Sequence, residues 1–250
     1  MRFHYSFNIV FYPFFSIAFG AGHELGISSI STRLSESNTR SKFFIPFQQQ
    51  GQGGSRILFM GESTCLGYGA EDRSVTVAGY FGADFRRSEI CNYGRNGYLL
   101  RDVSAQIGSL QGPALHERFD LAVNIIGGND TLWFTPISTI VKNLHLLLDR
   151  VQPLSHRVIL VYGGNLGELL IMPSYMRNAM RKRSSLVNDL FQSIAIERGV
   201  LFVNGFFEHD LRMVDPANFC PDLLHPCAQG YKHFYNHIRY KLDEANIILH

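Results

Sequence analysis

Two residues far apart in the chain, Ser63 and His225, suggest chemistry. A serine hydroxyl is a weak nucleophile until a base accepts its proton, and histidine is a base well suited to neutral pH. Asp222 precedes His225 by three residues, near enough to bond Nδ1 and leave Nε2 facing the serine. Pro226 disfavours helical geometry at His225, which predicts a loop there. Taken singly, a serine after glycine also suits a helix cap, and the Asp222–His225 segment also suits a surface loop.

An acyl-transfer site of this kind also needs donors for the anion formed by nucleophilic attack. Three candidates are the backbone amide of Ser63, the backbone amide of Gly97 and the side-chain amide of Asn129. Gly97 and Asn129 are separately ordinary turn residues. Together with a nucleophile, a base and an orienting acid, they predict an oxyanion hole.

Short apolar runs alternate with amphipathic stretches after residue 56, which predicts an α/β fold. The five strand candidates are residues 57–60, 89–92, 121–126, 158–162 and 200–203. Runs that are apolar on both faces suit a parallel sheet covered by helices, so we expect a three-layer α/β/α domain. Ligands bind such sheets at the carboxyl ends of the strands, where the candidate residues follow the apolar runs.

Four short motifs occur in a fixed order, and together they resemble the SGNH, or GDSL-type, hydrolase family over about residues 56–247. They are Gly61-Glu62-Ser63, Asn92-x-Gly94-x-x-Gly97, Gly127-x-Asn129-Asp130 and Asp222-x-x-His225-Pro226. The resemblance implies a flavodoxin-like parallel five-stranded sheet and ester hydrolysis through an acyl-enzyme. It also implies a catalytic triad of Ser63, Asp222 and His225, with Ser63, Gly97 and Asn129 as the oxyanion hole.

One residue departs from the family pattern, which usually has aspartate before the nucleophile where this chain has Glu62. The carboxylate is retained on a longer stem, so we expect a change in loop geometry rather than loss of activity. Cys65 is a rival nucleophile in the same turn, but the motif selects Ser63 and we expect a structural thiol.

These residues predict a serine carboxylester hydrolase acting on a lipid-like, acetylated or other small ester. The same triad would serve an O-acyltransferase, and the contrasting class is a catalytically silent binding module on the same fold. We expect no metal or organic cofactor, because the triad moves the proton and the donors stabilise the charge. No cysteine pair has metal-ligand spacing.

Composition limits the possible partners. The chain has 250 residues, of which 46% are hydrophobic, and 23 Lys and Arg against 21 Asp and Glu give a net charge of +2. This composition is globular, and the charge balance argues against a nucleic-acid partner. Cys220 and Cys227 flank the histidine loop, where they would either cross-link in an oxidising compartment or remain ordinary small residues.

The N-terminal residues differ in composition from the rest. Residues 1–27 contain an apolar run after Arg2, which predicts a signal peptide or membrane anchor; an N-terminal helix packed on a cytoplasmic domain is the alternative. Residues 28–55 are rich in Ser, Gln and Gly and predict a polar linker, with the hydrolase domain at 56–250. We therefore expect an exported or membrane-associated protein of the cell envelope or periplasm.

A segment after the fourth predicted strand, residues 163–183, combines apolar and basic residues. We interpret it as a flap beside the cleft that receives an acyl chain. The alternative is a loop and helix whose methionines pack on the core while the basic side chains face water.

Overall fold

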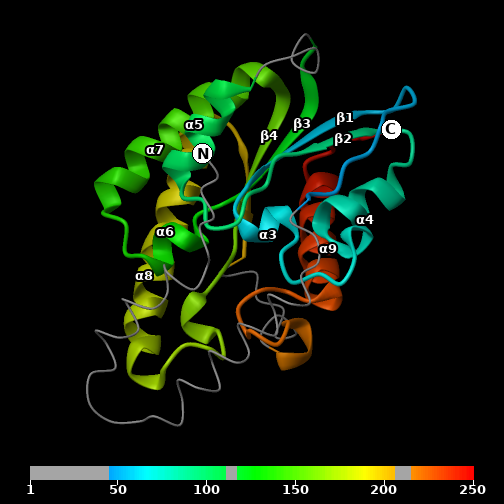
Figure 1. Ribbon diagram of the computed structural model, residues 1–250. Helices are drawn as coiled ribbons and strands as arrows, with labels where there is room; N and C mark the ends of the chain where they lie inside the picture. The colour runs from blue at the N-terminus through cyan, green and yellow to red at the C-terminus, as the bar shows by residue number, and fades with distance from the viewer. Residues whose placement is uncertain (1–44, 111–116, 206–214) are drawn as a thin grey trace, which may run out of the picture.

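A parallel sheet forms the centre of the computed structural model, which describes residues 45–110, 117–205 and 215–250 (Figure 1). Its order is β2-β1-β3-β4-β5, and all four strand pairs are parallel. The strands are β1 (Arg56–Gly61), β2 (Glu89–Asn92), β3 (Phe119–Ile125), β4 (Ser155–Tyr162) and β5 (Leu201–Asn204). This arrangement confirms the predicted α/β class with a five-stranded sheet.

Helices cover both faces of the sheet (Figure 1). One core cluster joins a face of the sheet to helices α5 (Leu100–Ser109), α7 (Ile137–Val151) and α8 (Ser174–Arg198). The other cluster joins the opposite face to α4 (Val77–Asp84) and α9 (Ala228–Glu244). Two short helices, α3 (Ser63–Leu66) and α6 (Gly128–Leu132), begin just beyond β1 and β3. The result is the predicted three-layer architecture.

The strand order places the candidate site at the topological switch point of the sheet, between β1 and β3. β1 pairs with β2 on one side and with β3 on the other, and Gly61 lies opposite Ile125 at the ends of β1 and β3. Loops that leave β1 and β3 turn toward opposite faces of the sheet, so a crevice opens between them. Ser63 follows β1 and Asn129 follows β3, which brings both to that crevice.

The buried face of helix α8 does not include all of its large apolar residues. Leu186 and Ile196 are exposed. Val187 and Phe191 are buried instead, together with the polar Asn188. Packing against the sheet therefore selects a face that includes polar residues, which a hydrophobic pattern does not detect.

Part of the predicted linker contacts the folded domain. Gln49 and Ile90 exchange two backbone hydrogen bonds in an antiparallel bridge to the edge strand β2. The side-chain amide of Gln48 also donates to the carbonyl of Asn92 at 2.6 Å. Hydrogen bonds of Gln48 and Gln49 therefore attach this part of the predicted linker to the domain, and Phe47 packs against the core.

The predicted signal or anchor segment 1–27 lies outside the described residues, as does the linker up to residue 44. Within the described part of the chain, no helix is long and apolar enough to span a membrane. Cys220 and Cys227 are free thiols, so the cross-link considered from the sequence is not formed.

We expect Gly61→Ala to destabilise the fold by about 3 kcal/mol, because an added Cβ would lie 2.0 Å from the carbonyl oxygen of Ile125. Gly163→Ala is the matched control, since its Cβ meets nothing within 4 Å. We expect that control to change the free energy of unfolding by less than about 1 kcal/mol. Urea unfolding measures both, and equal stabilities of the two variants would contradict the close approach at the end of β1.

Candidate active site

The tight turn between β1 and α3 positions Ser63. Gly61 ends the strand, Glu62 adopts extended geometry, and Ser63 is the first residue of helix α3. The backbone amides in the first turn of a helix have no intrahelical partner, so the Ser63 amide is available to a ligand. The side chain of Ser63 is 6% exposed, which keeps the hydroxyl largely out of bulk water.

His225 is presented by a small hairpin rather than by an open loop. Phe219 and Pro226 form an antiparallel bridge, and the Cys220 amide donates to the His225 carbonyl at 2.9 Å. Leu223 lies in the turn with a φ of 57°, a left-handed conformation that is rare for a branched side chain. The hairpin fixes the backbone of His225 before α9 begins at Ala228.

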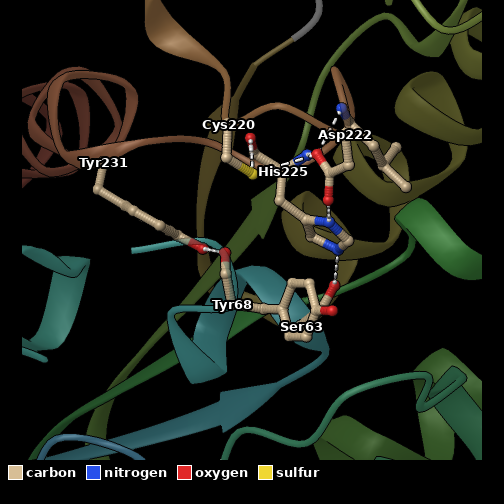
Figure 2. Close-up of polar contacts among 7 residues, drawn as sticks. Ser63, Tyr68, Cys220, Asp222, His225 and Tyr231 are labelled. Carbon is tan, nitrogen blue, oxygen red and sulfur yellow. Dashed lines mark hydrogen bonds and ion pairs between the residues drawn. The ribbon is translucent and has the colours of Figure 1, made fainter. Parts of the chain in front are cut away.

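The structure joins the three predicted residues in one chain of hydrogen bonds (Figure 2). Nε2 of His225 lies 3.0 Å from Oγ of Ser63, and Nδ1 lies 2.7 Å from Oδ2 of Asp222. All three residues are buried. This geometry allows the imidazole to accept the hydroxyl proton while the carboxylate stabilises the resulting imidazolium.

Asp222 is held as a carboxylate by its surroundings. Burial alone would raise its pKa, but the positive charge and the ring N–H of His225 outweigh it, and the backbone amides of Leu224 and His225 add to this effect. The two amides donate to Oδ1 at 3.0 and 2.9 Å, and the thiol of Cys220 donates to the same oxygen. The net effect lowers the pKa of Asp222.

Two tyrosines support the histidine, and neither was singled out from the sequence. The ring of Tyr68 packs against the His225 ring, with 4.6 Å between centroids. The hydroxyl of Tyr231 donates to the Tyr68 carbonyl at 2.6 Å (Figure 2). Tyr68 lies five residues after Ser63, and Tyr231 lies six residues after His225. One tyrosine therefore follows the nucleophile in the chain, and the other follows the base. No recognisable motif marks these positions.

Asn129 is fixed at both ends. Its side-chain amide donates to the carbonyl of Tyr98 at 2.9 Å, which leaves a second N–H for a ligand. Its backbone amide donates to Glu62. Gly97 precedes Tyr98 and has a left-handed φ of 76°, but it is not among the residues that line the cavity described next. Its role as an oxyanion donor therefore remains a prediction.

An open cavity of about 110 Å³ lies beside the triad. Ser63, His225 and Asn129 line it, so the nucleophile, the base and one candidate donor share one space. The remaining walls are mostly glycines and apolar side chains, including Gly163, Gly164, Gly205, Leu132, Leu166, Leu169, Phe219, Leu224 and Phe234.

The segment predicted as a flap is divided between two roles. Residues from Gly163 to Leu169 contribute to the cavity wall, in agreement with the first interpretation. Met172 and Met180 are buried, and Arg177, Arg181 and Lys182 are exposed, in agreement with the alternative. The contribution of this segment to the cavity wall thus ends before helix α8 begins.

Cys65 does not compete as a nucleophile. Its side chain is fully buried, and burial raises the pKa of its thiol far above the ordinary value. Its thiol faces Oδ1 of Asn92 at 3.7 Å. The described residues also contain no group of His, Cys, Asp or Glu side chains arranged to hold a metal ion.

The sequence profile of the GDSL-like lipase/acylhydrolase family matches residues 59–233. The chain belongs to this family, and its members are hydrolases that act on ester bonds. A comparison with curated proteins finds no match.

Solved structures share the fold at low sequence identity. A lipolytic G-D-S-L family protein from Veillonella parvula superposes with a TM-score of 0.61 at 17% identity, covering 76% of this chain and 96% of that one. A variant of an acetyl xylan esterase from Geobacillus stearothermophilus gives 0.59 at 20% identity, with coverages of 77% and 95%. The psychrotrophic esterase EstA from Pseudoalteromonas gives 0.59 at 15% identity, with coverages of 76% and 97%.

The lowered pKa of Asp222 predicts a specific loss of stability in acid. Because the folded state holds the carboxylate more strongly than the unfolded state, its contribution is complete above the ordinary pKa of 3.8 and is lost as pH falls below it. We expect Asp222→Asn to lower the free energy of unfolding at pH 7 by about 2 kcal/mol and to flatten its decline below pH 4. Asp243→Asn, an exposed carboxylate in α9, is the control. Parallel acid limbs for wild type and Asp222→Asn would contradict this assignment.

Proposed function

We propose that this hydrolase cleaves carboxylic esters of short acyl groups, with Ser63 as nucleophile, His225 as base and Asp222 as the residue that orients the imidazole. The observation that carries the proposal is the buried chain of hydrogen bonds from Asp222 through His225 to Ser63, which opens into the cavity. The family assignment supports ester hydrolysis independently of that geometry.

The reaction follows from the positions of the atoms. His225 Nε2 takes the proton of Ser63 Oγ as the oxygen attacks the ester carbonyl, and the resulting oxyanion is bound by the Ser63 amide and the Asn129 side chain. The imidazolium then gives its proton to the leaving alcohol, which departs as the acyl-enzyme forms. Water then attacks the acyl carbonyl as His225 removes its proton. The bond between the acyl carbon and Ser63 Oγ breaks, the imidazolium returns the proton to Oγ, and the acid product leaves.

The size of the cavity favours a short acyl group. A protein cavity of about 150 Å³ holds one benzene molecule, and the space beside Ser63 is about 110 Å³. Four glycines and several apolar side chains line it, which suits an acetyl to butyryl chain better than a long one. The likeness of the fold to an acetyl xylan esterase is consistent with an acetyl group.

Two parts of the functional prediction extend beyond the site geometry. An alcohol that replaces water in the second half-reaction would make the protein an O-acyltransferase with the same residues. Export or membrane attachment through residues 1–27 also stays a prediction, since those residues lie outside the described part of the chain.

We expect Ser63→Ala in the full chain to lower kcat/KM on p-nitrophenyl acetate by about 10⁴-fold or more, because the nucleophile is lost. Ser193→Ala, at a serine of α8 whose hydroxyl donates to the Asp189 carbonyl of the same helix, is the matched control and should keep wild-type turnover. A phosphonate ester should add to wild type but not to Ser63→Ala, which mass spectrometry of the labelled peptide would show. Undiminished turnover in Ser63→Ala would remove the assignment, and product analysis with added alcohols would distinguish hydrolysis from transfer.

We expect Leu169→Ala to shift acyl-chain preference toward longer chains, because it removes volume from the cavity wall. The ratio of kcat/KM on hexanoate to that on acetate should rise roughly tenfold, the effect of one or two methylenes in an apolar pocket. Leu186→Ala, an exposed position on α8, is the control. An unchanged profile across p-nitrophenyl esters would place the acyl group elsewhere.

A further inference from the structure

Glu62 connects the nucleophile turn to the loop that carries Asn129. Its Oε1 accepts the amide of Gly128 at 2.9 Å, and its Oε2 accepts the amide of Asn129 at 2.9 Å. Both amides belong to the first turn of α6, where backbone N–H groups have no intrahelical partner. One carboxylate therefore satisfies two adjacent donors, and it is the residue immediately before Ser63.

The contact between Glu62 and the loop after β3 leaves that loop little room to move. A Cβ at Gly128 would lie 2.6 Å from Glu62 Oε1, so the loop approaches the carboxylate as closely as glycine permits. Gly127 has a left-handed φ of 105°, which fixes the direction of the chain into α6. The side chain of Asn129 is held in turn by the Tyr98 carbonyl. The backbone and side chain of Asn129 are thus each fixed by one partner.

We propose that Glu62 is a positioning residue: it binds the backbone amide of Asn129 and so directs the side-chain amide of Asn129 toward the developing oxyanion, and it holds both backbone amides of the α6 turn fully only when it is ionised. The inference rests on the proposed function, because it concerns the same reaction. Glutamate in place of the usual aspartate then has a purpose in this chain: its longer stem spans the distance from the Ser63 turn to both amides.

The charges around Glu62 determine when it ionises. Burial raises its pKa, the amides of Asn129 and Gly128 lower it, and the charge of Asp130 from α6 raises it again, to a net value of about 8. Two weaker acids also face it: Cys65 from α3 and Tyr162 from β4, each of whose pKa it raises. The described groups that influence Glu62 electrostatically are therefore acidic, and the two amides are what favour the carboxylate.

Ionisation changes the number of good acceptors. A carboxylate offers lone pairs to both amides, whereas the protonated acid keeps one strong acceptor and turns the other oxygen into a donor. Asn129 is therefore held more firmly as pH rises through about 8. Catalysis should show this as an increase in rate as the pH rises through about 8.

The pH profile of Glu62→Gln tests the inference. We expect kcat of wild type to rise roughly tenfold between pH 7 and pH 9, the value of one charge-assisted hydrogen bond, with KM little changed. Glu62→Gln should lack this rise and should be about tenfold slower than wild type at pH 9. Asp149→Asn is the matched control: this carboxylate of α7 pairs with Arg198 and is not among the residues that line the cavity, so the variant should keep the alkaline rise. An alkaline rise in Glu62→Gln equal to that of wild type would overturn the proposal.

A double-mutant cycle separates positioning from general structural support. If Glu62 acts through Asn129, Glu62→Gln should cost nothing further in an Asn129→Ala background at pH 9. If the losses of rate in Glu62→Gln and Asn129→Ala instead multiply in the double variant, Glu62 does not act through Asn129. Glu62→Asp keeps the charge on a shorter stem that does not span to both amides, so we expect a reduced kcat and a smaller alkaline rise. This variant tests the proposal should Glu62→Gln fold poorly, and a kcat and alkaline rise equal to those of wild type would contradict it.

A substrate-free measurement distinguishes failure of this inference from failure of the proposed function. In wild type, the ¹⁵N–¹H resonances of Gly128 and Asn129 should shift with pH around 8, and in Glu62→Gln they should not. Resonances that do not titrate in wild type would overturn the role of Glu62 even if esters are hydrolysed. Resonances that titrate in a protein without ester turnover would support the grip on Asn129 and refute the reaction proposed for it.

Discussion

The hydrogen bond of 3.0 Å between His225 and Ser63 joins loops 162 residues apart in sequence, and the rest of the architecture serves to bring them together. Ser63 depends on the end of β1, which is held between β2 and β3. His225 depends on a hairpin that leads into α9, and α9 packs against α4 on the face of the sheet opposite to α5, α7 and α8. An error of 1 Å in the packing of that helix would separate the base from the nucleophile.

Two buried carboxylates in the same site are shifted in opposite directions. Asp222 faces the ring N–H of His225, the positive charge that this imidazole carries when protonated, and two backbone amides, which together lower its pKa. Glu62 also accepts two amides, but its neighbours are acids and burial raises its pKa to about 8. The difference lies in the sign of the nearby charge, since both side chains are almost completely buried. One site thus holds a permanent anion beside the base and a titrating acid beside the donor loop.

Sequence patterns predicted the features that depend on burial and spacing. β-strands apolar on both faces were found because the sheet is covered on both sides, and β4 was placed too late because His156 and Arg157 at its start are exposed. The relation of Asp222 to His225 was predictable because both lie in one short hairpin. The attachment of Gln48 and Gln49 to the domain was not, since it depends on backbone and side-chain amides that bond groups about 40 residues away. The double contact of Glu62 was missed for the same reason.

The glycines of the cavity wall differ in whether the surrounding structure leaves room for a side chain. A Cβ at Gly164 would lie 2.7 Å from the carbonyl oxygen of Gly205, and a Cβ at Gly205 would lie 2.5 Å from the carbonyl oxygen of Tyr162. Gly163, between Tyr162 and Gly164, has open space around the position of its missing Cβ. A single codon change there would place new atoms beside Ser63 without disturbing the scaffold. Substitution of Gly163 can therefore change acyl preference among relatives of this protein with little loss of stability.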